Sequence, residues 1–201
     1  MPEKPEILDA LGKSQEVSGD FNQALAAYGK LAVSQPASPL AQMRMANVHL
    51  TSKNQEEAIK SLRKALEIKP DLLEAQRALI LIALESKKPE DALAVARQVQ
   101  KQRPKEAIGM ALEGDIQAAG QHWPEAASAY RSALKLAAAP ELAIKLHSVY
   151  LAEKNRAEAE KTAAAWLKDH PKDVAFRFHL ADVALASKDY TTAAQYYRAA
   201  V

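Results

Sequence analysis

One helical pattern recurs six times in this 201-residue chain. In its first copy, Ala24, Tyr28 and Leu31 are spaced so that they share one helix face, and Pro36 ends the pattern. The next copy starts 34 residues later, and the same interval, once shortened to 33, separates the alanines Ala24, Ala58, Ala92, Ala126, Ala159 and Ala193. Such a period is typical of stacked helix–turn–helix units, which bury their apolar faces against one another.

The repeats predict an all-α chain with a single array over residues 5–201. The expected units are 5–38, 39–72, 73–106, 107–139, 140–173 and 174–201. No stretch keeps the strict apolar–polar alternation of a half-buried strand, so no sheet is expected. The six repeating alanines should all be buried where the two helices of a unit cross, because only a small side chain fits a close crossing.

The helix before the first copy adds a second pattern. Together the positions are Leu8, Leu11-Gly12, Phe21, Ala24, Tyr28 and Pro36. With them, residues 5–201 resemble the tetratricopeptide repeat (TPR) family. The resemblance implies a right-handed superhelical solenoid of about six repeats, in which the first helices line a concave groove. It also implies a non-enzymatic scaffold that binds a protein or peptide in that groove.

The fifth and ninth places of each first helix are those at which the resemblance puts exposed groove residues. From them we predict ten peptide-binding residues, namely Lys13, Met43, Asn47, Arg77, Leu81, Asp115, Ile144, Ser148, Phe178 and Asp182. The mixture of apolar and single polar side chains suits an extended peptide or an apolar helix face. The alternative is an ordinary surface without a ligand, because scattered apolar residues are normal on protein surfaces.

No catalytic constellation stands out in the sequence. It contains no glycine-rich phosphate loop, no H-E-x-x-H, no G-x-S-x-G and no cysteine. We therefore expect no enzyme activity, cofactor or metal site here, and any enzyme served by the repeats would lie outside this chain. His179 and Asp182 lie one turn apart, but two ligands do not complete a metal site, so we interpret them as polar residues on a solvated face. His147 is interpreted as a hydrogen-bonded packing residue.

The charges are balanced along the chain, with 27 basic and 25 acidic residues and a formal charge of +2. Without a basic stripe, no nucleic-acid partner is predicted. No apolar run is long enough to span a membrane, and the first five residues lack the apolar core of a signal peptide. On this basis alone, the chain is expected in the cytoplasm.

A narrower resemblance leads to a different location. The segments LEGD at 112–115, WPEAASAYR at 123–131, HPKD at 170–173 and LAD at 180–182 are similar to the TPR lipoproteins of bacterial PEP-CTERM and exopolysaccharide systems. This resemblance implies a periplasmic or cell-envelope protein that assists exopolysaccharide assembly or protein sorting, with a lipid-anchored N-terminus.

Two irregularities remain in the pattern. The period shortens between Ala126 and Ala159, and Trp166 occupies a place where other copies carry alanine, which together predict an irregular junction between the fourth and fifth units. The last copy ends at Val201 with apolar Tyr196 on its free side and no capping helix. We therefore expect a longer native array and self-association of this chain through its last repeat.

Overall fold

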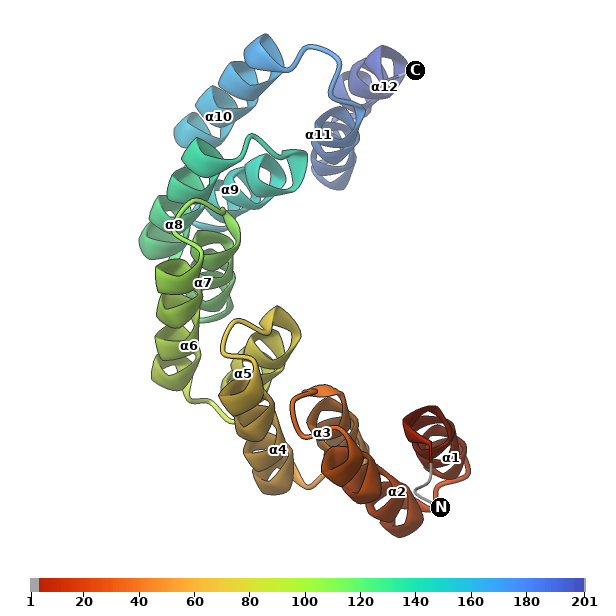
Figure 1. Ribbon diagram of the computed structural model, residues 1–201. Helices are drawn as coiled ribbons and strands as arrows, with labels where there is room; N and C mark the ends of the chain where they lie inside the picture. The colour runs from red at the N-terminus through yellow and green to blue at the C-terminus, as the bar shows by residue number, and fades with distance from the viewer. Residues whose placement is uncertain (1–3, 201) are drawn as a thin grey trace. The chain divides into compact units, whose positions relative to one another are not determined.

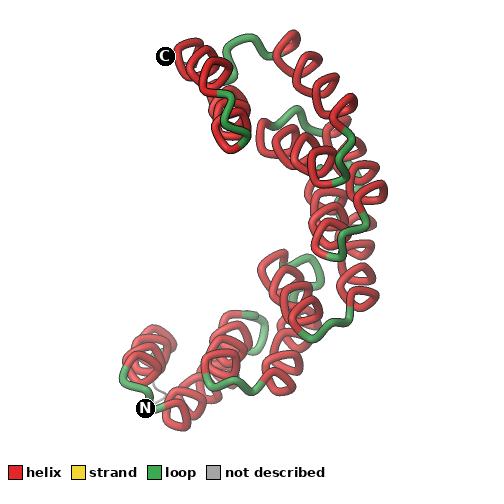
Figure 2. Tube along the Cα trace, turned by 180° about the vertical axis from the view of Figure 1, so that it is seen from behind, coloured by secondary structure: helices red, strands yellow, loops and turns green. Residues whose placement is uncertain are grey.

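The computed structural model describes residues 4–200, which form twelve α-helices and no strand (Figure 1). The helices are α1 (Pro5–Val17), α2 (Phe21–Ser34), α3 (Leu40–Thr51), α4 (Gln55–Ile68), α5 (Leu73–Glu85), α6 (Pro89–Gln102), α7 (Ile108–Ala119), α8 (Trp123–Leu136), α9 (Pro140–Ala152), α10 (Arg156–Asp169), α11 (Val174–Ala186) and α12 (Tyr190–Ala199). Short loops join them, as Figure 2 shows. The predicted all-α repeat fold is confirmed.

Two compact units divide the chain, one up to Val95 and one from Ala96 onward. In the first unit α1 packs against α2, α2 against α3, α3 against α4 and α4 against α5. In the second, α7 packs against α8, α8 against α9, α9 against α10 and α11, and α11 against α12. Each helix therefore contacts mainly its neighbours in sequence, as expected for a repeat array.

The turn inside each helix pair contains one residue with left-handed backbone geometry. Gly19 has φ +82°, and four lysines and a glutamine take the same place in later units, at Lys53, Lys87, Gln121, Lys154 and Lys188. A side chain at positive φ is strained, by about 1–2 kcal/mol. The turn is thus set by the two helices that it joins, since its own residues do not favour it.

Side-chain sizes compensate where the two helices of a unit cross. A Cβ atom on Gly12 would lie 2.3 Å from the ring of Tyr28, and one on Gly114 would lie 2.5 Å from that of Tyr130. The fifth unit reverses the sizes, since buried His147 occupies the glycine's place and Ala163 the tyrosine's. Close packing requires such compensation. The six repeating alanines are at most 3 % exposed, which confirms their predicted burial.

In the second unit an opening of about 590 Å³ lies between α9–α10 and the helix pair α11–α12, beside a core that Ala163 on α10 shares with Phe176 on α11. The irregular junction that the sequence predicts between the fourth and fifth repeats stays a prediction. Trp166 lies on α10 and its ring centroid is 6.0 Å from that of Phe176 on α11. Its bulk therefore acts on the helix that follows it.

Candidate functional site

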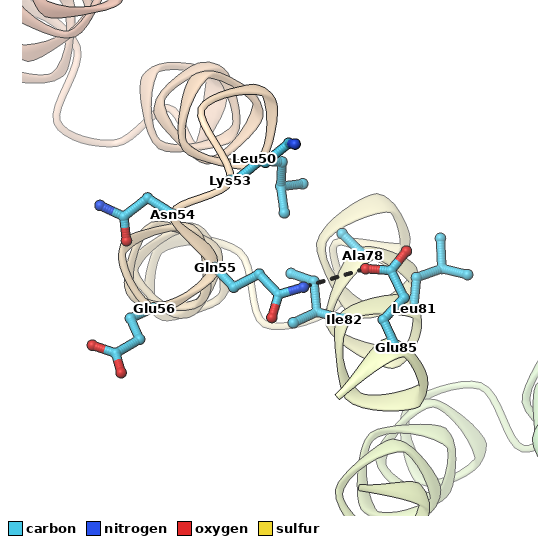
Figure 3. A pocket seen from close by; sticks show the side chains of 9 residues that line it. All are labelled: Leu50, Lys53, Asn54, Gln55, Glu56, Ala78, Leu81, Ile82 and Glu85. Carbon is cyan, nitrogen blue, oxygen red and sulfur yellow. Dashed lines mark hydrogen bonds between the residues drawn. The ribbon is translucent and has the colours of Figure 1, made fainter. Parts of the chain in front are cut away.

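A cleft of about 720 Å³ opens on the first unit between the α3–α4 turn and α5 (Figure 3). Its apolar lining comes from Leu50 at the end of α3 and from Ala78, Leu81 and Ile82 on α5. Ile82 is buried, but Leu81 is 61 % exposed. Burial of such a leucine by a partner would contribute about 1.5–3 kcal/mol. The cleft therefore offers an apolar contact that the chain itself leaves open.

Polar side chains surround this lining. Gln55 donates a hydrogen bond of 3.4 Å to Glu85, drawn dashed in Figure 3, and accepts one of 3.3 Å from Ser86. Asn54 caps α4 by accepting from the backbone N–H of Glu57. The side chain of Lys53, whose backbone lies in the strained turn, has no hydrogen-bond or ion-pair partner among residues 4–200. The rim thus presents a cation and acceptors around an apolar floor.

Arg77 lies one helical turn before Leu81 on the same face of α5. Arg77 is exposed, and its side chain makes no hydrogen bond or ion pair within the described part of the chain. The structure therefore places Arg77 one turn from Leu81, which lines the cleft, and leaves both side chains available to a partner.

The other predicted residues of the first unit are engaged in contacts within the chain. Lys13 forms a 2.7 Å salt bridge with Asp9, which also accepts a 2.9 Å hydrogen bond from Arg44. Burial alone would raise the pKa of Asp9, but these two cations hold it below its usual value. Met43 is half-buried and packs against a core that includes Ala46.

Glu16 on α1 forms hydrogen bonds with side chains on α2 and α3. It accepts hydrogen bonds from Asn47, one of the predicted residues, and from the hydroxyl of Tyr28 at 3.1 Å. Burial, with the nearby carboxylate, raises the pKa of Tyr28 to about 12. Asn47 is exposed but already hydrogen-bonded, so a partner would have to compete with Glu16 for it.

In the second unit, Asp115 has two partners. It accepts a hydrogen bond of 2.7 Å from the hydroxyl of Tyr130 on the paired helix α8. It also accepts hydrogen bonds of 2.5 and 2.8 Å from Nζ of Lys145 on α9. Burial, together with the bond to Asp115, raises the pKa of Tyr130. Asp115 thus links three helices, which is a structural role.

Asp182 on α11 is held in a similar way. It accepts a hydrogen bond from Tyr197 on α12, whose ring centroid lies 5.8 Å from that of Phe178. Phe178 is 44 % exposed and Ser148 is exposed, while Ile144 is half-buried against the core around Phe176. Of the predicted residues here, Phe178 and Ser148 are the most accessible.

The interpretation of His147 is confirmed, but that of His179 and Asp182 needs correction. His147 is buried, and its Nδ1 lies 2.9 Å from Nε2 of His179. His179 is half-buried against it, so it does not lie on a solvated face. Asp182 is exposed yet hydrogen-bonded to Tyr197. Periodicity alone did not show the contact between neighbouring first helices that buries His179.

Sequence reasoning missed two kinds of residue. The cleft around Leu81 is completed by Leu50, Ala78 and Glu85, which occupy other helical places than the two considered. Arg44 and Lys145 also reach back to carboxylates on preceding first helices, 35 and 30 residues earlier. A carboxylate followed by a basic residue about one period later is the sequence signal that could have found these pairs.

Within residues 4–200, no helix is long and apolar enough to cross a membrane. Within the same range, no group of three or more His, Cys, Asp or Glu side chains is arranged to hold a metal ion.

Comparison with known proteins places the chain in a family. The tetratricopeptide repeat model matches residues 10–72, 77–143 and 148–201. The chain belongs to the tetratricopeptide repeat family. This confirms the resemblance to the TPR family and the fold class, an all-α TPR solenoid. Among curated protein sequences, none matches this TPR chain significantly.

Three solved structures illustrate the similarity of fold. The MamA protein is 19 % identical, with a TM-score of 0.62 over 86 % of this TPR chain and 94 % of that one. PilF of Pseudomonas aeruginosa is 18 % identical, with a TM-score of 0.61 over 96 % and 88 %. PilW, described as a widely conserved type IV pilus biogenesis factor, is 19 % identical, with a TM-score of 0.61 over 96 % and 90 %.

Proposed function

We propose that this TPR chain is a non-enzymatic scaffold that binds a peptide or protein segment on its first helices, with the cleft around Leu81 as the main anchor. The observation that carries the proposal is the 61 % exposure of Leu81 beside an apolar cleft of about 720 Å³. An extended peptide can place one apolar side chain there and interact with Arg77 through an acceptor or carboxylate.

The remaining predicted residues take lesser roles in this proposal. Phe178 and Ser148 are accessible on the second unit and offer contacts there that are separate from the cleft. Lys13, Asn47, Asp115 and Asp182 are already paired within the chain, so a partner gains little from them unless it displaces the internal bond. Met43 and Ile144 mainly support the core.

Selection from a random twelve-residue peptide library displayed on phage tests the proposal. Peptides enriched on the parent chain are then measured against two variants, Leu81→Glu and Val33→Glu. Val33 lies on α2 and is 83 % exposed, which makes it a matched control for a charge on an exposed apolar residue. We expect Leu81→Glu to weaken binding by at least about tenfold, because a charge replaces an anchoring contact. Equal loss in both variants would contradict the proposal.

A second candidate is an assembly factor of the cell envelope. It is supported by the segments that resemble envelope TPR lipoproteins and by a fold similar over 96 % of this chain to PilW. Fractionation of the source cells with an antibody against the chain tests it. Recovery with the envelope fraction would support this role, whereas recovery only with cytosolic proteins would reject it.

Self-association through the last repeat is a further proposal. Leu185 and Tyr190 are 47 % and 65 % exposed on this repeat, and Val201, which the prediction also used, lies outside the described residues. Sedimentation velocity of the parent and a Leu185→Lys, Tyr190→Lys variant tests the idea. A concentration-dependent increase in sedimentation coefficient that the variant abolishes is expected, and a monomeric parent at high concentration would reject it.

A further inference from the structure

Two histidines meet where α11 packs against α9. His147 on α9 is 4 % exposed, and His179 on α11 is half-buried. Nδ1 of His147 and Nε2 of His179 are 2.9 Å apart, and the rings meet edge to face with centroids separated by 4.9 Å. One ring donates the hydrogen bond and the other accepts it, so the contact requires at least one unprotonated nitrogen.

The surroundings make this pair a joint between the last helix pair and the rest of the second unit. α11 packs against α9, and His147 lines an opening of about 590 Å³ between α9–α10 and α11–α12. Phe176 lies beside both imidazoles, with ring centroids at 5.9 Å from His147 and 5.8 Å from His179, and it also packs against Ala143 and Ala163. The two histidines therefore form part of the contact that holds α11 against α9.

Few charges are placed to compensate a proton on the pair. From α11, Asp182 faces His179, but it already accepts a hydrogen bond from Tyr197 of α12. The remaining ionisable residues of the opening are Lys154 at the end of α9, Arg156 and Glu160 on α10, and Asp189 and Tyr196 beside or on α12. Arg156 and Glu160 pair with each other at 3.1 Å, and Asp189 caps α12 by accepting the backbone N–H of Thr192, so both carboxylates of the opening are already engaged.

We propose that the His147–His179 pair is a pH-sensitive joint that holds α11 and α12 against α9 near neutral pH and releases them in acid. A first proton can be shared between the facing nitrogens. A second cannot, because both nitrogens would then carry hydrogens and both rings a positive charge in a buried contact. Release would move Phe178 and Asp182, which lie on α11, and widen the opening beside α10.

The direction of the pH effect follows from the burial of the rings. Burial, with His179 alongside, lowers the pKa of His147 from 6.5 to about 4, and burial lowers the pKa of His179, although Asp182 opposes that shift. The released state therefore binds protons more readily than the packed one. The packed state is fully favoured above pH 6.5 and is weakened as the pH falls from there toward the lowered value of His147.

The chain has no cysteine, so one introduced thiol can report on the joint. Ala163 on α10 is 8 % exposed and lines the opening, and Ala163→Cys adds only a sulfur atom there. Its rate of reaction with 4,4′-dithiodipyridine is measured between pH 7.5 and pH 5 and divided by that of Ser128→Cys, an exposed control on α8. We expect this ratio to rise by at least about tenfold at pH 5, while circular dichroism shows unchanged helix content.

Histidine variants test whether the pair causes the rise in the rate ratio. His147→Gln with His179→Gln keeps a donor and an acceptor but cannot titrate, so the ratio should stay constant. If that double variant fails to fold, His179→Gln alone should reduce the rise. His170→Gln alters the ring that lies against Trp166 and leaves the pair unchanged, so the rise in the rate ratio should persist in this variant. A constant ratio in the parent, a rise that persists without the pair, or a rise that accompanies general loss of helix would overturn the proposal.

Discussion

The first helix α5 differs from α7 and α11 in what its predicted groove residues do. On α5, Arg77 and Leu81 are exposed, Leu81 lines a cleft, and the side chain of Arg77 is unpaired among residues 4–200. On α7 and α11, Asp115 and Asp182 each accept the hydroxyl of a tyrosine from the paired helix. The repeat period places a side chain on the groove face, but its neighbours decide whether a partner can use it.

A tyrosine at the helix crossing accounts for much of this difference. Tyr130 passes over Gly114, which leaves no room for a Cβ, and its hydroxyl reaches the carboxylate on the groove face. The third copy of the pattern carries Ala96 at the tyrosine's place. A tyrosine at that place therefore holds the groove-face carboxylate of its own repeat in an internal hydrogen bond, as Tyr130 does with Asp115 and Tyr197 with Asp182.

The largest expected effect is from removal of the tyrosine. Tyr130→Ala should lower the free energy of unfolding by about 3–5 kcal/mol, because it removes a buried ring and leaves a cavity above Gly114. Urea unfolding followed by circular dichroism measures this. Tyr190→Ala, at a tyrosine that is 65 % exposed, is the control and should change stability by less than about 0.5 kcal/mol. Equal losses of stability in the two variants would show that buried Tyr130 contributes no more than exposed Tyr190.

A smaller loss is expected when the glycine is enlarged. Gly114→Ala should cost about 1–3 kcal/mol, because its Cβ would lie 2.5 Å from the ring of Tyr130. Addition of Tyr130→Leu creates the alanine–leucine combination that the second repeat, residues 39–72, has at Ala46 and Leu62. This double variant should recover part of the loss relative to the sum of the single changes, and additive losses would argue against size compensation.

Loss of the hydroxyl alone should have a modest effect. Tyr130→Phe keeps the packing but removes the donor to Asp115, while Lys145 stays within 2.8 Å of that carboxylate. We expect a loss of about 1 kcal/mol in urea unfolding. A loss as large as that of Tyr130→Ala would mean that the hydrogen bond, and not the ring, dominates.

The smallest expected effect concerns Asp9 and its two cations. Because the folded-state pKa of Asp9 lies below 3.8, its contribution is complete above that value and is lost as the pH falls through the folded-state pKa. Asp9→Asn should remove this acid-dependent part, which we expect to be at most about 1 kcal/mol. Unfolding free energies of both proteins between about pH 5 and 2 measure it, and parallel curves would show no contribution.

Much of the fold could be predicted because the repeat period is regular. The buried alanines, the twelve helices and the packing role of His147 follow from spacing alone. Occupancy of the groove could not be predicted, because it depends on contacts between residues about 15 or 30 apart, such as Tyr130 and Lys145 with Asp115. The packing of Trp166 against Phe176 on α11 likewise depends on the direction of its side chain, which the period does not specify.

The central claim is that the cleft around Leu81 carries binding and that the tyrosine-bound carboxylates do not. The affinity of one library-selected peptide for two variants tests this claim most directly. Isothermal titration calorimetry at a temperature where all variants are folded supplies the dissociation constants. Leu81→Glu should weaken binding by at least about tenfold, and Asp115→Asn should change it by less than about twofold although it lowers stability. Unchanged affinity in Leu81→Glu together with a large loss in Asp115→Asn would contradict the account.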